Sequence, residues 1–351
     1  MRNVIRVLMI SEHYWPTVGG VQRHIEGIVN ELTARGLRVA VLTATDSPTA
    51  PRQEILKNSS IVRIPYGWDH NPLLVALWMI EHHSWIKEHD IIHVHDTIPL
   101  VFWYAPLVLF SPKRPVFATF HGFEEDPVPT MYRVLRKIAR RLVRKCLCIG
   151  GFISREYGMK CDIVSLGATE LLPLPRRQRE GAVFVGRIEE DTGIIEHVNA
   201  LAILREKHGI SLKLTVCGSG SIRQDVADMA LSKGVVVEFT GTIDDPKEIM
   251  NRSEFCLAGG YLSILEAMSL GLPVLGIARS PLKAAYLRAV LEQGGPMSIQ
   301  TSPEDIADEI ARLIKNPGLA AEVSERGTMF AATMSWKRLA DVYLALWSAS
   351  S

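Results

Sequence analysis

Short apolar runs alternate with stretches of helical period along the first half of the chain. Each run is bounded by turn residues, so we expect buried parallel strands. The stretch 21–35 has the 3.6-residue period of a helix and stops at Gly36. Strand after helix after strand predicts a doubly wound α/β domain over residues 1–165. The expected strands are 4–10, 38–43, 61–64, 91–95, 116–120, 147–149 and 163–166.

The same alternation restarts after a proline-bearing stretch at 171–180, which we interpret as a linker. A second Rossmann-like domain is therefore expected over 166–332, and an amphipathic helix in 333–351 is expected to pack back on the first domain. Such folds bind ligands at the carboxyl ends of their strands, so we expect the ligand cleft between the domains. The expected strands are 182–185, 212–217, 236–240, 255–257 and 273–277, and the helices are 194–207, 221–233 and 246–253.

Composition narrows the class of protein. The chain has 351 residues, 47% of them hydrophobic, and a formal net charge of +1, which argues against a nucleic-acid binder. Five cysteines form neither C-x-x-C pairs nor zinc spacings, so we expect them reduced, and we expect no metal site. The first residues do not resemble a signal peptide, and the longest apolar run, 98–110, is too short to span a bilayer. We therefore expect a cytoplasmic protein.

Basic residues are concentrated in the first half of the chain. Residues 1–170 contain 20 Lys and Arg against 16 Asp and Glu, and seven of these basic residues alternate with apolar ones over 132–145. One interpretation is an amphipathic helix that docks on an anionic membrane surface, which would make the protein peripheral on the cytoplasmic face. The other is an ordinary solvated helix face.

The segment 258–274, A-G-G-Y-L-S-I-L-E-A-M-S-L-G-L-P-V, combines a glycine loop, an apolar helix and a turn into a strand. We expect Ser263 to cap this helix. The loop N–H groups and the helix dipole would then favour a phosphate or diphosphate. Glu266, one turn into the helix, could reach the vicinal hydroxyls of a ribose. The alternative is an apolar helix with one exposed glutamate.

Four further segments are expected at strand ends: P-T-V-G-G-V at 16–21, T-F-H-G-F at 119–123, V-G-R at 185–187 and C-G-S-G at 217–220. Each is weak alone. His121 could be structural, Arg187 could be a surface charge, and the Gly218 loop lacks the third glycine of a dinucleotide fingerprint. In this order and at these spacings, they indicate a nucleotide-dependent enzyme.

With these pieces, residues 5–346 resemble a family 4 glycosyltransferase of the two-domain GT-B architecture. The matching motifs also include H-V-H-D at 93–96, F-T-G-x-I at 239–243 and L-E-A-M-x-x-G-L-P-V at 265–274. The resemblance implies transfer of a sugar from a nucleotide-sugar donor to a glycan, lipid-linked or small-molecule acceptor. It also implies retention of anomeric configuration, with no catalytic metal and no cofactor.

The resemblance assigns roles to individual positions. It implies that His121, Arg187 and Glu266 are catalytic, with His121 near the donor sugar, Arg187 on the leaving diphosphate and Glu266 on the ribose. The implied donor-binding residues are Gly19, Gly20, Arg187, Thr192, Gly218, Ile243, Tyr261, Leu262, Ser263 and Glu266.

Three positions depart from the family pattern. Ala258 stands where a glutamate usually contacts the donor sugar, Thr192 where a lysine usually contacts phosphate, and Tyr261 where glycine is favoured. Loss of the lysine beside three acidic residues should weaken diphosphate binding by about 1–3 kcal/mol. The combination is similar to a branch of the family with a modified E-x7-E motif. The alternative is a catalytically silent nucleotide-sugar-binding or scaffold protein of the same fold.

Overall fold

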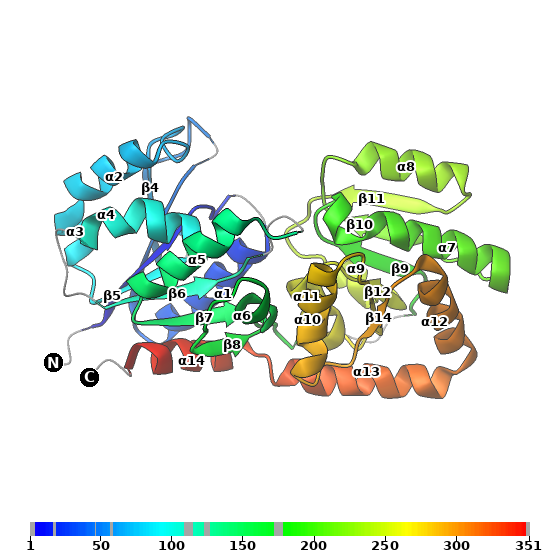
Figure 1. Cartoon of the computed structure of the whole chain (residues 1–351). Coiled ribbons are helices and arrows are strands. Elements are labelled where there is room, and N and C mark those ends of the chain that lie inside the picture. The colour runs from blue at the N-terminus through cyan, green and yellow to red at the C-terminus, as the bar shows by residue number, and fades with distance from the viewer. Residues whose placement is uncertain are drawn as a thin grey trace. The chain divides into compact units, whose positions relative to one another are not determined.

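The computed structural model describes residues 4–16, 19–45, 47–56, 59–108, 115–122, 127–171 and 178–348. The chain divides into two compact units, one made of Met1–Ser165 with Trp336–Ser351 and the other of Leu166–Ser335 (Figure 1). Each unit is a parallel sheet with helices packed on it, which confirms the predicted α/β class of two Rossmann-like units. Thr17, Val18, Phe123 and most of the expected linker lie outside the described residues.

The first unit has an eight-stranded sheet in its described part, in the order β3-β4-β2-β1-β5-β6-β7-β8. All neighbours are parallel except β3 and β4. The order reverses between β1 and β5, which is the switch point where such sheets bind ligands. The strands are β1 (Arg6–Ser11), β2 (Arg38–Thr43), β3 (Gln53–Leu56), β4 (Ser59–Arg63), β5 (Ile91–His95), β6 (Val116–Phe120), β7 (Lys145–Ile149) and β8 (Ile163–Ser165).

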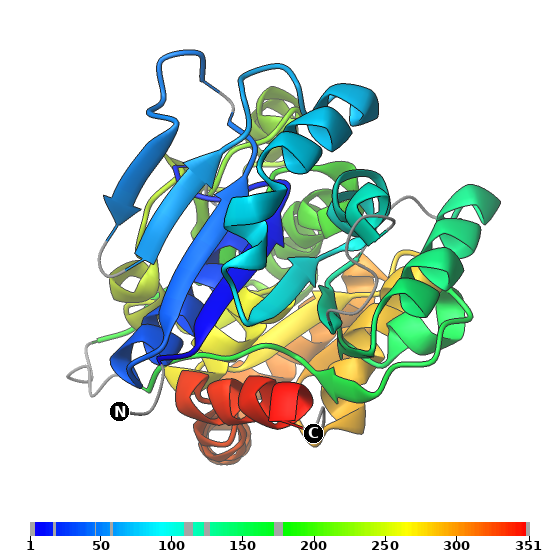
Figure 2. The same cartoon turned by 90° about the vertical axis from the view of Figure 1, so that its left-hand side faces the viewer.

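Helices connect these strands, and one of them returns from the far end of the chain. α14 (Trp336–Ser348) packs along α1 (Gly20–Ala34), as Figures 1 and 2 show. Gly27 permits this contact, because a Cβ there would lie 2.5 Å from the indole ring of Trp336. The remaining helices are α2 (Pro72–Glu81), α3 (His83–Lys87), the π-helical turn η1 (Pro99–Tyr104), α4 (Ala105–Val108), α5 (Thr130–Leu142) and α6 (Phe152–Glu156).

The second unit has a six-stranded sheet in its described part, in the order β11-β10-β9-β12-β13-β14, with all neighbours parallel. Its switch point lies between β9 and β12. The strands are β9 (Ala182–Val185), β10 (Leu214–Cys217), β11 (Val237–Gly241), β12 (Phe255–Leu257), β13 (Val274–Ile277) and β14 (Ser298–Gln300). The helices are η2 (Glu190–Thr192), α7 (Ile194–His208), α8 (Arg223–Ser232), α9 (Lys247–Asn251), α10 (Tyr261–Ser269), α11 (Pro281–Glu292), α12 (Pro303–Lys315) and α13 (Pro317–Ala332).

Two expectations about local structure are wrong. Gly260, not Ser263, caps α10, and the Ser263 hydroxyl donates back to the Gly260 carbonyl oxygen at 2.9 Å. The basic helix expected over 132–145 ends at Leu142, because Lys145 already pairs with Phe117 in the sheet. Across the described residues, no helix is long and apolar enough to cross a bilayer.

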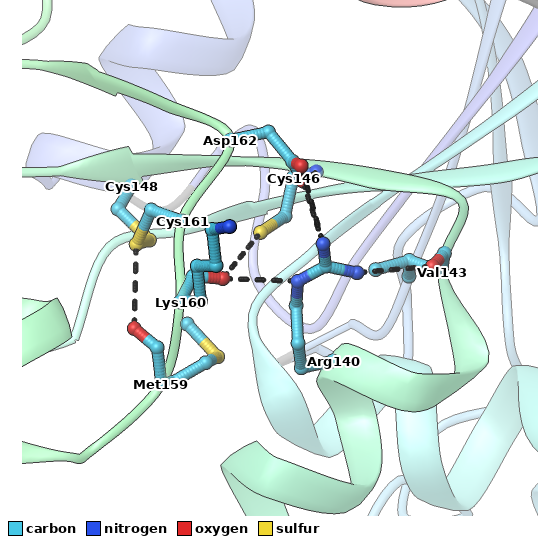
Figure 3. Close-up of polar contacts among 8 residues, drawn as sticks. All are labelled: Arg140, Val143, Cys146, Cys148, Met159, Lys160, Cys161 and Asp162. Atoms are coloured by element: carbon cyan, nitrogen blue, oxygen red, sulfur yellow. Dashed lines mark hydrogen bonds and ion pairs between the residues drawn. A yellow bond between two sulfur atoms is a disulfide. The ribbon is translucent and has the colours of Figure 1, made fainter.

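The expectation that all five cysteines are reduced is also wrong. Cys148 at the end of β7 forms a disulfide with Cys161, which precedes β8, and Figure 3 shows the bond. β7 and β8 are neighbouring parallel strands joined by a short crossover, so the two Cα atoms lie 6.0 Å apart. A separation of 13 residues matches no cysteine motif, and the sequence therefore gave no signal of it. The remaining cysteines, 146, 217 and 256, are free and buried.

Candidate functional site

In the second unit, the predicted loops all stand at the carboxyl ends of adjacent strands. Gly186 and Arg187 follow β9, and Gly218 follows β10. Gly218 is required by backbone packing, because a Cβ there would lie 1.9 Å from the carbonyl oxygen of Gly186. Gly218, which the resemblance places among the donor-binding residues, is therefore also required by the backbone packing of this unit.

Arg187 is held by an acidic neighbour. Its Nη2 lies 2.8 Å from Oδ2 of Asp191, and its side chain is 67% exposed. A second acid of this loop is also bound. Glu189 accepts from the backbone N–H and the hydroxyl of Ser221, at 2.8 and 2.5 Å, and these bonds lower the pKa of Glu189. Two of the three acidic residues, Glu189 and Asp191, are thus held by hydrogen bonds within the unit.

Thr192 is buried and faces the loop that follows β12. Its hydroxyl donates to the carbonyl oxygen of Glu189 at 2.7 Å. A Cβ on Gly259 would lie 2.9 Å from the Thr192 carbonyl oxygen and 3.3 Å from its Cβ. The position where the family has a lysine therefore abuts the glycine loop, and a hydroxyl that is bonded locally occupies it.

The α10 helix begins at the end of this loop, with Gly260 as its cap in extended backbone. Tyr261, Leu262 and Ser263 form its first turn, where N–H groups lack helical acceptors and favour an anion. Glu266, one turn further, is only 4% exposed. The alternative interpretation of an exposed glutamate on an apolar helix is therefore wrong.

Tyr261 is joined closely to α11. Its ring stacks on that of Tyr286, with centroids 4.0 Å apart and planes 6° apart. Two hydrogen bonds reinforce the pair: Tyr261 N–H donates to the Tyr286 hydroxyl at 2.9 Å, and the Tyr261 hydroxyl donates to the Tyr286 carbonyl oxygen at 2.7 Å. The first N–H of α10 thus has a partner within the protein. Ile243, another of the expected donor-binding residues, is half-buried in the turn after β11.

In the first unit, Gly19 caps α1 and Gly20 begins it, so both lie at a helix N-terminus. Neighbouring strands bring Asp96 and His121 together. Asp96 has a φ of 68°, a conformation uncommon for a residue with a side chain, and its Oδ1 accepts from the His121 N–H at 2.8 Å. The carboxylate thereby fixes the backbone on which His121 stands.

Arg136 supports this arrangement from α5. It is fully buried, its guanidinium lies over the rings of Phe120 and Tyr157, and its Nη2 is 3.9 Å from Oδ1 of Asp96. Burial, and next to it the positive charge of Arg136, lowers the pKa of His121 to about 3. His121 is therefore neutral at pH 7.

His121 belongs to a cluster of four histidines, with His24 of α1 and His93 and His95 of β5. The ring of His121 lies 4.7 Å from that of His24, and its Nε2 is 3.0 Å from Nδ1 of His95. Burial lowers the pKa of His24, His93 and His95 well below the usual value, so all four rings are neutral. Among the described residues, no set of three or more His, Cys, Asp or Glu side chains is arranged to hold a metal ion.

Hydrogen bonds from α14 fix the protons of this cluster. The indole N–H of Trp347 can only donate, and it donates to Nδ1 of His93 at 3.1 Å. Nε2 of His93 must then carry the proton and donate to the Thr119 hydroxyl at 2.8 Å.

The chain of bonds continues to α1. The Thr119 hydroxyl donates to the Tyr343 hydroxyl, which donates to Nε2 of His24, each at 2.8 Å. The Trp347 indole can only donate, so it sets the donor and acceptor of every hydrogen bond in this series. The C-terminal helix therefore orients the rings of His93 and His24.

Several of these residues were not predicted as part of a site. The motif H-V-H-D was noted, and its alternation places His93 and His95 on one face of β5, which is the signal that could have found them. The sequence predicts Arg136 only as part of the basic helix over 132–145, either membrane-docking or solvated, and Tyr343 only as part of the packing C-terminal helix. No local pattern marks either one, because their roles depend on contacts far along the chain.

Two α/β units with glycine loops at the carboxyl ends of parallel strands define the GT-B class of glycosyltransferases, and solved structures share this fold. Sucrose-phosphate synthase of Thermosynechococcus elongatus matches with a TM-score of 0.76 at 18% identity, over 99% of this chain and 100% of that one. HepE of Anabaena, solved with UDP and glucose, matches with a TM-score of 0.74 at 15% identity, over 99% and 100%.

Two family models then match the sequence: Glycosyltransferase Family 4 over residues 18–155 and Glycosyl transferases group 1 over residues 174–329. The chain belongs to the family 4 glycosyltransferases and is an enzyme that uses a nucleotide-sugar donor. It is 24% identical to a glycogen synthase of Mycobacterium tuberculosis, over 97% of this chain and 95% of that protein. It is 23% identical to a phosphatidyl-myo-inositol mannosyltransferase of Propionibacterium freudenreichii, over 98% and 95%.

Proposed function

We propose that this enzyme is a retaining glycosyltransferase that moves a sugar from a nucleoside-diphosphate sugar to a glycan, lipid-linked or small-molecule acceptor. The observation that carries the proposal is the second unit's loop at 258–260. It leads into the N-terminus of α10, with Glu266 buried one turn further in the same helix. A relative that is a phosphatidyl-myo-inositol mannosyltransferase supports a lipid-linked acceptor, and one that is a glycogen synthase supports a glycan.

The proposed chemistry needs positive charge where the diphosphate leaves. The bond from the anomeric carbon to the phosphate oxygen breaks through an oxocarbenium-like state, and the acceptor oxygen bonds to the same face. The departing phosphate takes the acceptor's proton. Arg187 and the first turn of α10 stabilise the new negative charge, so we propose that no catalytic metal is required.

The second candidate is a catalytically silent nucleotide-sugar-binding protein. The observations that favour it are Ala258 in place of a sugar-binding glutamate and the pairing of Arg187 with Asp191. Such a protein would bind a nucleotide sugar and release no nucleoside diphosphate. Transfer assays separate the two candidates directly.

The test uses the purified full chain with UDP-, GDP- and ADP-sugars, glycan and lipid-linked acceptors, and EDTA throughout. We expect release of nucleoside diphosphate and a product whose anomeric configuration, read by NMR, equals that of the donor. Inversion, or activity only after metal is added, would overturn the corresponding part of the proposal. Binding without release would identify the silent protein.

Glu266→Gln tests the ribose role in the same assay. We expect nucleoside-diphosphate affinity to fall about tenfold or more, since a hydrogen bond to a charged group contributes about 1.5–3 kcal/mol. Glu325→Gln, an exposed position on α13, is the matched control and should bind as the wild type does. Unaltered binding by Glu266→Gln in calorimetry would remove Glu266 from the ribose site.

A further inference from the structure

Lys283 is a buried cation that the family pattern does not account for. It lies on α11, is only 4% exposed, and its Nζ donates to the carbonyl oxygen of Gly259 at 2.7 Å. The same ammonium lies 4.9 Å from the centre of the Tyr286 ring. A lysine side chain is rarely buried to this extent unless its surroundings stabilise the ammonium.

Lys283 and the position where the family's lysine is missing both contact the Gly259 loop. Thr192 borders the Gly259 loop from one side, with its carbonyl oxygen 2.9 Å from where a Cβ on Gly259 would be. Lys283 reaches the same glycine from α11. Thr192 and Lys283 therefore contact the same loop from two different elements, η2 and α11.

The three residues that differ from the family pattern, Thr192, Ala258 and Tyr261, all lie at or beside the loop at 258–260. Tyr261 stacks on Tyr286, and Tyr286 gives its ring face to the ammonium of Lys283. Ala258 places no carboxylate at the start of the loop. A carbonyl oxygen and the face of an aromatic ring both bind the ammonium.

The electrostatics of the surroundings favour an anion beside Lys283. Burial lowers the pKa of Lys283 to about 8, Arg187 and Arg279 add to this effect, and Asp191 opposes it. The buried ring of His197 has its pKa lowered to about 3, first by burial and then by the charge of Lys283. Lys283 thus remains largely protonated at pH 7 in a place that disfavours the charge, and an anionic ligand would relieve this cost.

We propose that Lys283, with its ammonium at the Gly259 loop, supplies the phosphate-directed positive charge that the family's lysine at position 192 would supply. The inference rests on the proposed function, because it assigns a further residue to the same diphosphate site. It also explains how the loss at Thr192 is offset: the cation enters from α11, and the Tyr261–Tyr286 pair holds its side chain in place.

The experiment begins with UDP, GDP and ADP as probes, measured by calorimetry on the full chain at pH 7. The best-bound diphosphate and its monophosphate are then compared in Lys283→Met. We expect the diphosphate to lose about 10- to 100-fold in affinity and the monophosphate clearly less, since charge-assisted hydrogen bonds of this strength are removed. An equal loss for both ligands would mean that Lys283 only supports the loop, and would overturn the proposal.

A second experiment moves the positive charge from position 283 to position 192. In Thr192→Lys with Lys283→Met, the cation returns to the family's position, and we expect about tenfold recovery of diphosphate affinity over Lys283→Met. A structural role at the Gly259 carbonyl would give no recovery. Circular dichroism and thermal unfolding check that each variant is folded.

A pH series keeps the proposal testable if the double variant fails to fold. Because only the protonated amine attracts phosphate, wild-type diphosphate affinity should fall as pH rises from 7 to 9, whereas Lys283→Arg should retain affinity with a flatter profile. Identical profiles would overturn the assignment. If the wild type binds none of the three diphosphates, the proposed function itself fails. If the wild type and Lys283→Met bind a diphosphate equally well, only the role of Lys283 fails.

Discussion

At Gly122, a methyl group would lie 1.7 Å from Nη2 of Arg136. The glycine therefore makes room for a buried guanidinium, which in turn faces Asp96, whose carboxylate accepts from the backbone of His121. A methyl group at position 122 would force the Arg136 guanidinium to move, and this movement is costly because the guanidinium is buried against two aromatic rings. The orientation of a candidate catalytic histidine thus depends on a residue with no side chain.

We expect Gly122→Ala to lower the transfer rate at least tenfold and to destabilise the protein by about 1–3 kcal/mol, because Arg136 must move. Steady-state kinetics and thermal unfolding measure the two effects. Gly318→Ala is the matched control at an open position at the start of α13. Because alanine favours the helix, the transfer rate should be unchanged and the stability should not fall. A fully active Gly122→Ala would show that Arg136 does not position His121.

The residues of the candidate site could be predicted from the sequence only in part. Glycines and charges at strand ends were found, since a parallel sheet collects them at one edge. The tautomers of the histidines depend on Trp347 and Tyr343, and the buried cation depends on Lys283. Each of these contacts joins positions far apart in the chain, so no local period or spacing marks them.

At the scale of elements, apolar runs located most strands well, because strands buried on both faces read as continuous hydrophobic segments. The predicted bounds of β2, β5, β6, β9 and β12 are confirmed. β3 was missed, since it is an edge strand with a polar pattern and its Ile55 is 81% exposed. An edge strand need not bury both faces, and its sequence therefore lacks the signal.

The helix α5 shows how tertiary contacts revise a surface predicted from the sequence. Of the seven basic residues that one interpretation places against a membrane, Arg136 is buried. Arg140 is bound to the Lys160 carbonyl oxygen and to Asp162, as Figure 3 shows. Met131, Val134 and Ile138, with exposed fractions of 62%, 50% and 39%, form an apolar stripe on its outer side. The exposed basic residues in this region are Arg133, Lys137, Arg141 and Arg144.

We propose that this face of α5 docks reversibly on anionic lipid. Each basic residue near such a surface contributes about 1 kcal/mol, and salt screens the attraction. The full chain should therefore sediment with anionic but not neutral liposomes at low salt, and less at high salt. Lys137→Glu with Arg141→Glu should abolish the effect, whereas Lys233→Glu with Lys315→Glu, an equal charge change on the second unit, should not. Equal recovery in the supernatant under every condition would leave α5 as a solvated helix.

At the scale of the whole molecule, the buried histidines make stability depend on pH. Burial lowers the folded-state pKa of five histidines below the usual range: His24, His93, His95, His121 and His197. Below about pH 6.5, the unfolded chain binds protons on these histidines that the folded chain does not. The free energy of unfolding must therefore fall as the pH falls through this range.

We expect the unfolding temperature to drop steadily from pH 7 to pH 5, with each suppressed histidine contributing up to about 1.4 kcal/mol per pH unit. Differential scanning calorimetry measures the slope. His93→Gln should show a shallower slope, whatever its stability at pH 7. Asn30→Gln, which changes no titratable group at an exposed position of α1, should keep the wild-type slope. Equal slopes in all three proteins would contradict the neutral cluster.

The return of α14 to the first unit has a consequence for the growing chain. When a ribosome has delivered residue 335, every strand of both sheets has been made, but Tyr343 and Trp347 have not. Until α14 emerges, Gly27 has no Trp336 indole packed against it, and His93 lacks the Trp347 N–H that fixes its proton. The unit whose synthesis begins first is thus completed last, after the unit inserted within it. Nascent chains shorter than this would have to keep the face of α1 that meets α14 from associating with other proteins.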